Sequence, residues 1–275
     1  MNGQVLRTIA VKDLKEVKQN RAAWIPALIV PLIFFVLLPL AIILAPSLFS
    51  FSMMPLLSES GPVGMMRENI PELAAKLAGL NEQQTWVVLM TGYLFAPFIL
   101  ILPLMLSTIV GAESFVGEKE RKTIEALIYT PATDGELFLG KVLASVVPAI
   151  ALTWLGFLVY GVVVNVAGWS VMGRIWFPPV AWWPLMLVVT PAIATLGMAV
   201  IVIISARVNT FMEAYQMSAS LVVLVLMLVA GQVTGILYLS VGMAFAVGLA
   251  LWIIDAVLIW LGIRNFARET LLSRI

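Results

Sequence analysis

Residues 25–48 read IPALIVPLIFFVLLPLAIILAPSL, a stretch without a single charged side chain. A helix rises about 1.5 Å per residue, so roughly 20 apolar residues cross a hydrocarbon core about 30 Å thick. This stretch is long enough to cross, and it has no clear small-residue cleavage site after it. We therefore expect a retained membrane span and not a secretory signal.

Similar apolar segments recur along the chain, of which 62% is apolar and 11% charged, with a mean hydropathy of +1.06. Globular domains are roughly 45–50% apolar and about 25% charged. We expect an all-α polytopic membrane protein in which residues 1–275 form a single transmembrane domain. The six expected spans are 24–49, 86–111, 137–167, 182–205, 215–229 and 240–262. The last start is open, because the apolar run 236–262 fits a tilted span or a re-entrant piece followed by a span.

The distribution of Lys and Arg predicts the orientation of these spans. With the N-terminus inside, three of the 16 cations, Arg67, Lys76 and Arg174, fall in outer segments and the other thirteen fall in cytoplasmic ones. Such an excess is the positive-inside pattern. We therefore expect a multi-pass protein of the cell membrane with both termini in the cytoplasm.

Two segments outside the spans show helical periodicity. Residues 1–23 predict an amphipathic helix on the cytoplasmic leaflet, with Val5, Leu6, Ile9, Leu14 and Val17 on its apolar face and Lys12, Lys15, Glu16 and Lys18 in water. The outer segment 50–85 repeats Met66, Ile70, Leu73, Leu77 and Leu80 at helical spacing. The outer segment is either a small lid helix or a plain connector on the headgroups.

The residue types that are absent exclude several chemistries. The chain has no Cys and no His, which removes the usual zinc sites, thiol nucleophiles and His-dependent triads. A net charge of +1 carries no sign of a nucleic-acid partner, and we expect none. Residues 135–141 fit Gly-x4-Gly-Lys, but Val142 supplies no hydroxyl for Mg²⁺ and no strand precedes the segment. We expect no resident cofactor and no metal.

The densest group of charges is ESFVGEKERKTIEALIYTPATDGELFLGK, residues 113–141. Its pattern predicts a helix from Glu118 to about Tyr129, with i,i+3 and i,i+4 charge pairs on one face. Pro131 stops that helix, and Thr133 with Glu136 forms a capping box for the next span. The segment 113–136 is either a solvated charged loop or a rigid corner that transmits a push from a soluble partner.

The same segment resembles the signature of the ABC-2 type permeases, the membrane subunits of ATP-driven exporters. The similarity rests on Glu118-Lys-Glu120, Thr123-Ile-Glu125, Leu127-Ile128, Thr130-Pro131, Glu136 and Gly140-Lys141, with Lys122 in place of the family's Gly and Ile124 in place of its Leu. The rest of the chain is similar in outline, including the turn 205–214 before the fifth span.

The resemblance implies a coupling helix that docks on a separate ATPase subunit, which would hold the ATP and Mg. It also implies two permease copies, identical or different, in the lipid bilayer. It places Glu118, Arg121, Thr123 and Glu125 at the docking contact. The full set of candidate coupling residues is Glu118, Glu120, Arg121, Thr123, Glu125, Pro131, Glu136 and Lys141. The hairpin 118–141 would then drive the outward movement of a cargo. We expect that cargo to be hydrophobic or amphipathic, because few buried charges line the spans.

Asp255 is the one acid placed well inside a span. A carboxylate at that depth suggests a proton or cation relay, or a hydrogen-bonded or protonated group between spans. Its presence keeps open a secondary transporter that uses Asp255. A separate alternative is an ATP-driven complex that transmits force to an outer or membrane partner without cargo, although the outer segment 50–85 is small for that task. An intramembrane enzyme would need polar residues clustered over several spans.

Overall fold

The structure is a computed structural model that describes residues 3–48, 64, 69–123, 133–234 and 236–265. Every regular element among these residues is a helix. Six helical segments are long and apolar enough to span a membrane: Arg21–Ser47, Glu82–Glu120, Gly135–Ala167, Trp182–Ser205, Phe211–Val233 and Val241–Gly262. The prediction of an all-α polytopic membrane protein is confirmed.

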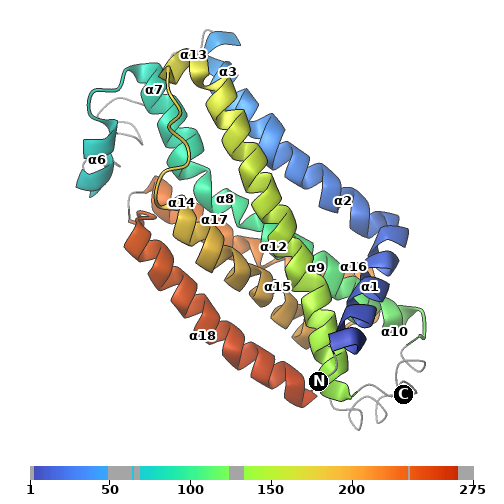
Figure 1. Ribbon diagram of the computed structural model, residues 1–275. Coiled ribbons are helices and arrows are strands. Elements are labelled where there is room, and N and C mark those ends of the chain that lie inside the picture. Colours follow the sequence, from blue (N-terminus) through green and yellow to red (C-terminus); the bar gives the residue numbers. More distant parts are fainter. Residues whose placement is uncertain (1–2, 49–63, 65–68, 124–132, 235, 266–275) are drawn as a thin grey trace.

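Four spans are built from several helical pieces, and the first, second and fourth of the six contain π-helical turns; Figure 1 shows how the helices are arranged. The first contains α2 (Arg21–Leu32), η1 (Ile33–Leu37) and α3 (Leu38–Leu48), and follows α1 (Gly3–Gln19). The second contains α7 (Glu82–Val87), η2 (Val88–Leu94), α8 (Ala96–Ile99), α9 (Ile101–Ala112), η3 (Glu113–Gly117) and α10 (Glu118–Glu120), and follows α6 (Pro71–Leu77). The third span is α12 (Asp134–Ala167). The fourth contains α14 (Trp182–Pro184), η4 (Leu185–Val189) and α15 (Thr190–Ser205), and follows the short α13 (Trp169–Met172). The fifth contains α16 (Phe211–Ala219) and α17 (Val222–Val233), and the sixth is α18 (Val241–Asn265).

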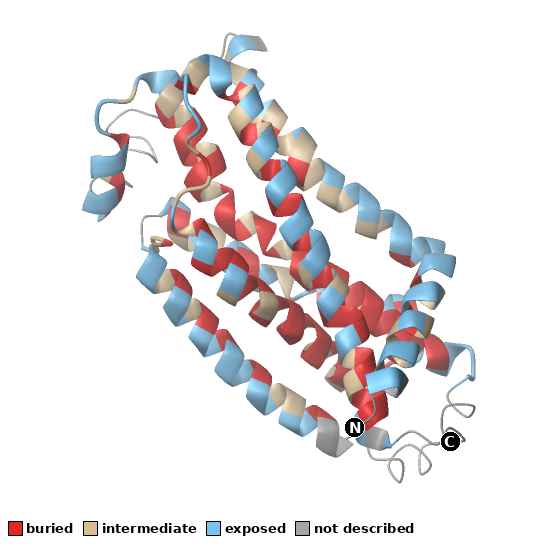
Figure 2. Cartoon of the chain, viewed as in Figure 1, coloured by how far each residue is buried: buried red, intermediate tan, exposed pale blue. Residues whose placement is uncertain are grey.

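The second and fourth spans form the interior of the bundle (Figure 2). Within their most apolar windows, 78% of the second span and 67% of the fourth are buried, against 17–33% for the other four. The outer spans therefore present apolar side chains to the surroundings, as lipid-facing helices do. In Figure 1, α1 and α10 lie at one end of the bundle, called here the α10 end. Helices α6, α7 and α13 lie at the other, called the α13 end.

The π-helical turns leave backbone carbonyls available, and aromatic side chains of neighbouring spans donate to them. The hydroxyl of Tyr160 donates to Thr91 O at 2.6 Å, and Trp182 Nε1 donates to Gly92 O at 2.7 Å, both in η2. Trp154 Nε1 donates to Met186 O of η4 at 2.9 Å. A buried polar group needs such a partner in a dry interior, so these bonds tie α12 to the second and fourth spans and α14 to the second.

The bounds of the spans differ from the hydropathy windows at several ends. The second span begins at Glu82, directly after the Asn81–Gln84 capping box, and continues to Glu120, where we expected 86–111. The first span begins at Arg21, after Asn20 accepts a hydrogen bond from Ala22 N at 3.0 Å. The fifth starts earlier, at Phe211, with Thr210 as its cap. Caps and polar contacts set these ends, and hydropathy does not register them.

The helix predicted from Glu118 is corrected by the structure. Residues 118–120 are the last turn of the second span, and the chain then turns at Arg121 and Lys122, whose φ is +57°. Residues 124–132, which would complete the predicted helix, lie outside the described residues. In the last apolar run, residues 236–240 are not helical and α18 starts at Val241, so the span is shorter than the run 236–262 and the re-entrant alternative for the residues before it stays a prediction.

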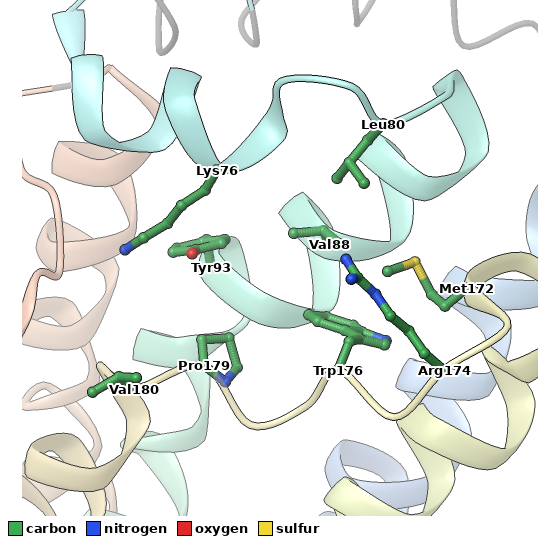
Figure 3. A pocket seen from close by; sticks show the side chains of 9 residues that line it. All are labelled: Lys76, Leu80, Val88, Tyr93, Met172, Arg174, Trp176, Pro179 and Val180. Atoms are coloured by element: carbon green, nitrogen blue, oxygen red, sulfur yellow. The ribbon is translucent and has the colours of Figure 1, made fainter.

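The helix predicted in segment 50–85 is present as α6, with Pro71 in its first turn. Leu73 and Leu77 are buried in one cluster with Leu89 and Tyr93 of the second span. Figure 3 shows α6 lying across the end of that span. The described part of the segment therefore packs onto the bundle; Met66 lies outside the described residues.

Candidate coupling site

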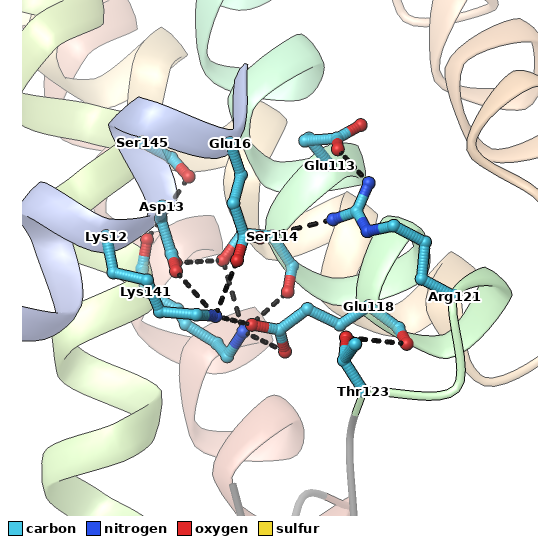
Figure 4. A network of polar contacts seen from close by, with 10 residues as sticks. All are labelled: Lys12, Asp13, Glu16, Glu113, Ser114, Glu118, Arg121, Thr123, Lys141 and Ser145. Atoms are coloured by element: carbon cyan, nitrogen blue, oxygen red, sulfur yellow. Dashed lines mark hydrogen bonds and ion pairs between the residues drawn. The ribbon is translucent and has the colours of Figure 1, made fainter. Parts of the chain in front are cut away.

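Ten polar residues meet at the α10 end, where α1, the end of the second span and the start of α12 come together (Figure 4). Four of the predicted coupling residues are among them: Glu118, Arg121, Thr123 and Lys141. Glu120 and Glu136 lie on the same elements, α10 and α12. Glu125 and Pro131 lie outside the described residues, so their place in the site stays a prediction.

Glu118 is the centre of the cluster. Its carboxylate lies 2.6 Å from the Lys141 ammonium of α12 and also pairs with Lys12 of α1. Glu118 and Lys141 are buried, with side chains 2% and 3% exposed. Because removing one partner of a buried pair leaves an uncompensated charge, this contact holds three elements together strongly. In this conformation Glu118 faces the interior and not a docking partner.

Arg121 forms the second ion pair of the site. Its guanidinium lies 2.5 Å from the Glu113 carboxylate and 3.1 Å from that of Glu16 on α1. Asn20 Nδ2 donates to the other Glu113 oxygen at 2.7 Å. Gly117 leaves room for Glu113, because a Cβ there would lie 3.0 Å from the carboxyl carbon. Arg121 therefore ties the turn after the second span to α1, and Asn20, between α1 and α2, holds the Glu113 carboxylate with which Arg121 pairs.

Charge decides the chemistry that this site can support. Three carboxylates, on Asp13, Glu16 and Glu118, come within 4.8 Å of one another, as metal ligands do. However, the Lys12 ammonium pairs with all three, at 3.5 Å from Asp13 and 3.2 Å from Glu16. The group is therefore a lysine-bridged ion-pair cluster, in which a protein cation already occupies the place of a metal.

Burial and charge shift the titration of the cluster in two ways. Burial disfavours the Lys12 ammonium, but the hydrogen bond and charge of Glu118 outweigh it, with help from Asp13 and Glu16, so the pKa of Lys12 is raised. Burial also raises the pKa of Asp13, against the charge of Lys141 and a hydrogen bond from Ser114. Lys12 therefore stays charged at neutral pH.

The neighbouring signature residues contact the turn between the fourth and fifth spans. Lys119 Nζ donates to Val208 O at 2.8 Å. The Glu120 carboxylate accepts from Phe211 N at 2.8 Å, at the first turn of α16, where a negative charge complements the helix dipole. Successive residues 118–120 thus reach different parts of the bundle.

Local hydrogen bonds hold the described residues on either side of positions 124–132. Thr123 Oγ1 donates to Glu118 O at 3.2 Å. At the other end, Glu136 N donates to Thr133 Oγ1 at 3.3 Å and Thr133 N donates to Glu136 at 3.1 Å, which confirms the predicted capping box.

The contribution of α1 to the site was not predictable from its own sequence pattern. We expected Lys12 and Glu16 in water and Leu14 on the apolar face, whereas Lys12 and Glu16 are in the cluster, Leu14 is exposed and Asp13 is 1% exposed. The reason is that α1 packs against the charged end of the second span, with Glu118 and Arg121, and not only against an apolar surface. The Lys12–Glu16 pair at i,i+4 was visible in the sequence, but its partners lie about a hundred residues away.

Asp255 lies in the middle of α18 and is fully buried. Neither of its carboxylate oxygens has a hydrogen-bond partner among the described residues. The interpretation of a hydrogen-bonded link between spans is therefore wrong within the described part of the chain. A buried polar group without a partner is expensive, which marks Asp255 as a functional candidate separate from the α10 end.

Six helices long and apolar enough to cross a membrane define a polytopic membrane protein, in which a charge cluster joins three elements at the α10 end. Comparison with protein families matches residues 7–268 to the ABC-2 family transporter proteins. The chain belongs to that family, and it is accordingly the membrane permease component of an ABC transporter and not the catalytic one. No curated protein matches the chain.

Proposed function

We propose that this chain is the permease subunit of an ABC exporter and that a separate ATPase subunit drives it through residues 118–141. The observation that carries the proposal is the buried Glu118–Lys141 pair, which joins the second and third spans directly beside the exposed turn 121–123. An ATPase that docks on this turn and the segment after it has a rigid connection to both spans.

The charge cluster supplies the stiffness that such coupling needs. Breaking one partner of a buried, hydrogen-bonded pair is unfavourable by about 3–5 kcal/mol, so the elements joined by Glu118 and Lys141 move together and do not slide. Through Lys119 and Glu120 the same movement reaches the turn before α16. ATP and Mg belong to the partner subunit in this proposal, and the α10 end faces the cytoplasm, which is also the side where we expect both termini.

The surface of the bundle supports a pairing of two permease copies, identical or different. The first, fifth and sixth spans are 17%, 17% and 22% buried in their most apolar windows. These faces are available to lipid or to a second permease. A pathway between two such apolar faces suits a hydrophobic or amphipathic cargo better than a bare ion.

Co-purification with the ATPase subunit tests the proposal. We expect Arg121→Ala and Glu125→Ala to reduce ATPase capture or its stimulation at least severalfold, while the amount of permease in the membrane stays normal. Arg207→Ala is the matched control, because Arg207 is an exposed cation on a different turn. The proposal fails if the wild-type chain captures no ATPase in mild detergent, or if Arg121→Ala and Arg207→Ala behave alike.

Burial of Asp255 without a partner favours a second candidate, a transporter driven by a proton gradient. That candidate predicts proton flux across proteoliposomes that contain this chain alone, and loss of the proton flux in Asp255→Asn. The ABC proposal predicts no such flux, together with ATPase stimulation by Asp255→Asn within about twofold of wild type. The two measurements therefore separate the candidates.

A further inference from the structure

A pocket of about 290 Å³ lies at the α13 end, opposite the charge cluster (Figure 3). Its walls come from α6, from η2 of the second span and from the segment that follows α13. Two regions far apart in the sequence, residues 76–93 and 172–180, therefore build one concave surface, as ligand sites commonly require.

Two cations line this pocket, Lys76 and Arg174. They are two of only three Lys and Arg residues that the sequence assigns to outer segments, yet they lie 98 positions apart and converge on one surface. Arg174 is exposed and makes no ion pair or side-chain hydrogen bond within the described ranges. Its guanidinium therefore offers five donors to a ligand, in a geometry that suits phosphate and carboxylate.

Lys76 is positioned more firmly than Arg174. Its ammonium lies 2.7 Å from the Glu72 carboxylate and 3.0 Å from the Tyr238 hydroxyl, and 5.9 Å from the centre of the Tyr93 ring. Burial disfavours its charge, but the bonds to Glu72 and Tyr238 outweigh burial and raise the pKa of Lys76. Glu72 neutralises one of the two cations, so the rim keeps a net positive charge from Arg174.

The rest of the wall is apolar and aromatic. Besides Tyr93, it consists of Trp176, Leu80, Val88, Met172, Pro179 and Val180. Figure 3 shows the Arg174 guanidinium lying beside Trp176 and Val88. A free inorganic anion gains nothing from contact with an apolar wall. An amphiphile, by contrast, places its polar group on the cations and buries its apolar chain against that wall.

We infer that this pocket binds the phosphate or carboxylate headgroup of an anionic amphiphile, with Arg174 as the principal anchor. Lys76 provides a second, fixed charge, and Trp176 with Val88 receives the first part of the apolar chain. The site depends on neither the ATPase nor the charge cluster, so it stands apart from the proposed function.

Native mass spectrometry of the purified full chain tests the inference with three probes: phosphatidylglycerol, phosphatidylcholine and inorganic phosphate. We expect phosphatidylglycerol to bind at least severalfold more tightly than the other two. Arg174→Ala should weaken its binding on the order of tenfold, consistent with loss of a charge-assisted, bidentate contact. Lys76→Gln should weaken it less, and Arg207→Ala, which removes the same charge at the other end, should leave it unchanged.

Each alternative result overturns a definite part of the inference. Equal binding of phosphatidylcholine removes the requirement for an anion. Phosphate that binds as tightly as phosphatidylglycerol makes the site one for a free anion. An equal effect of Arg174→Ala and Arg207→Ala reduces the role of Arg174 to general surface charge. Because Arg174 is exposed, its substitution does not disturb the core of the bundle.

Discussion

Lys12 and Lys141 pair with different oxygens of the Glu118 carboxylate, and they differ in burial. The Lys141 side chain is 3% exposed and that of Lys12 is 42% exposed, while Glu118 is 2% exposed. Exposed pairs contribute about 0–1 kcal/mol, whereas loss of one partner of a buried pair is far more unfavourable. Lys141 therefore matters more than Lys12 for the stability of the α10 end.

We predict that Lys141→Met destabilises the folded protein by about 3–5 kcal/mol, because it leaves Glu118 buried next to a single, partly exposed cation. Thermal unfolding in detergent, followed by the fluorescence of the nine Trp residues, measures the effect. The double variant Lys141→Met with Glu118→Leu should recover a large part of the loss, because it removes the uncompensated charge.

Lys15→Met is the matched control for this prediction. Lys15 is an exposed cation of α1, and exposed substitutions of this kind usually change stability by less than about 0.5 kcal/mol. If Lys141→Met unfolds at the same temperature as Lys15→Met, the buried pair does not stabilise the junction of the second and third spans.

At the scale of the helices, α12 contacts the first span where a glycine of α12 meets a phenyl ring. Phe35 of η1 is 2% exposed, and a Cβ on Gly156 would lie 1.8 Å from its ring. Such a distance is impossible, so the first and third spans approach this closely only because Gly156 has no side chain. Small residues allow close helix contacts in membranes in the same way.

We predict that Gly156→Ala destabilises the protein by about 1–3 kcal/mol, because the added methyl group forces a buried ring or the first span to move. Gly161→Ala on the same helix is the control, since a Cβ there would meet Phe177 at an ordinary 3.6 Å. Alanine is favoured over glycine in a helix by about 1 kcal/mol, so Gly161→Ala should be neutral or stabilising. Opposite signs for the two variants, read from thermal unfolding, confirm the contact; equal effects contradict it.

How well each element could be predicted follows from what determines it. The spans were predictable because length and hydropathy are local properties of the sequence. The capping box of Thr133 and Glu136 was predictable for the same reason. The Glu118 contacts were not, because Lys12 lies 106 positions away and the π-helical turn at Glu113–Gly117 changes which side chains share a face. From the sequence, only i,i+4 pairs within one helix could be proposed for Glu118. In the structure its partners are instead Lys12 and Lys141, which lie on other helices.

At the scale of the whole molecule, the two ends of the bundle differ in charge. The α10 end holds the cluster of Lys12, Lys141 and Arg121 with its carboxylates, together with the exposed Lys15 and Lys18. At the α13 end, Lys76 and Arg174 are the cations among the described residues. Cytoplasmic segments carry the excess of Lys and Arg in membrane proteins, so this difference favours a cytoplasmic α10 end.

We predict that single cysteines introduced at the two ends react differently with a membrane-impermeant maleimide. The chain contains no Cys, so each variant carries one thiol. Lys18→Cys and Ala206→Cys, both at exposed positions near the α10 end, should react only after the cells are permeabilised. Ser170→Cys and Glu82→Cys, exposed at the α13 end, should react in intact cells. The reverse pattern would invert the membrane orientation and place the charge cluster out of reach of a cytoplasmic ATPase, whereas labelling of all four in intact cells would contradict six membrane crossings.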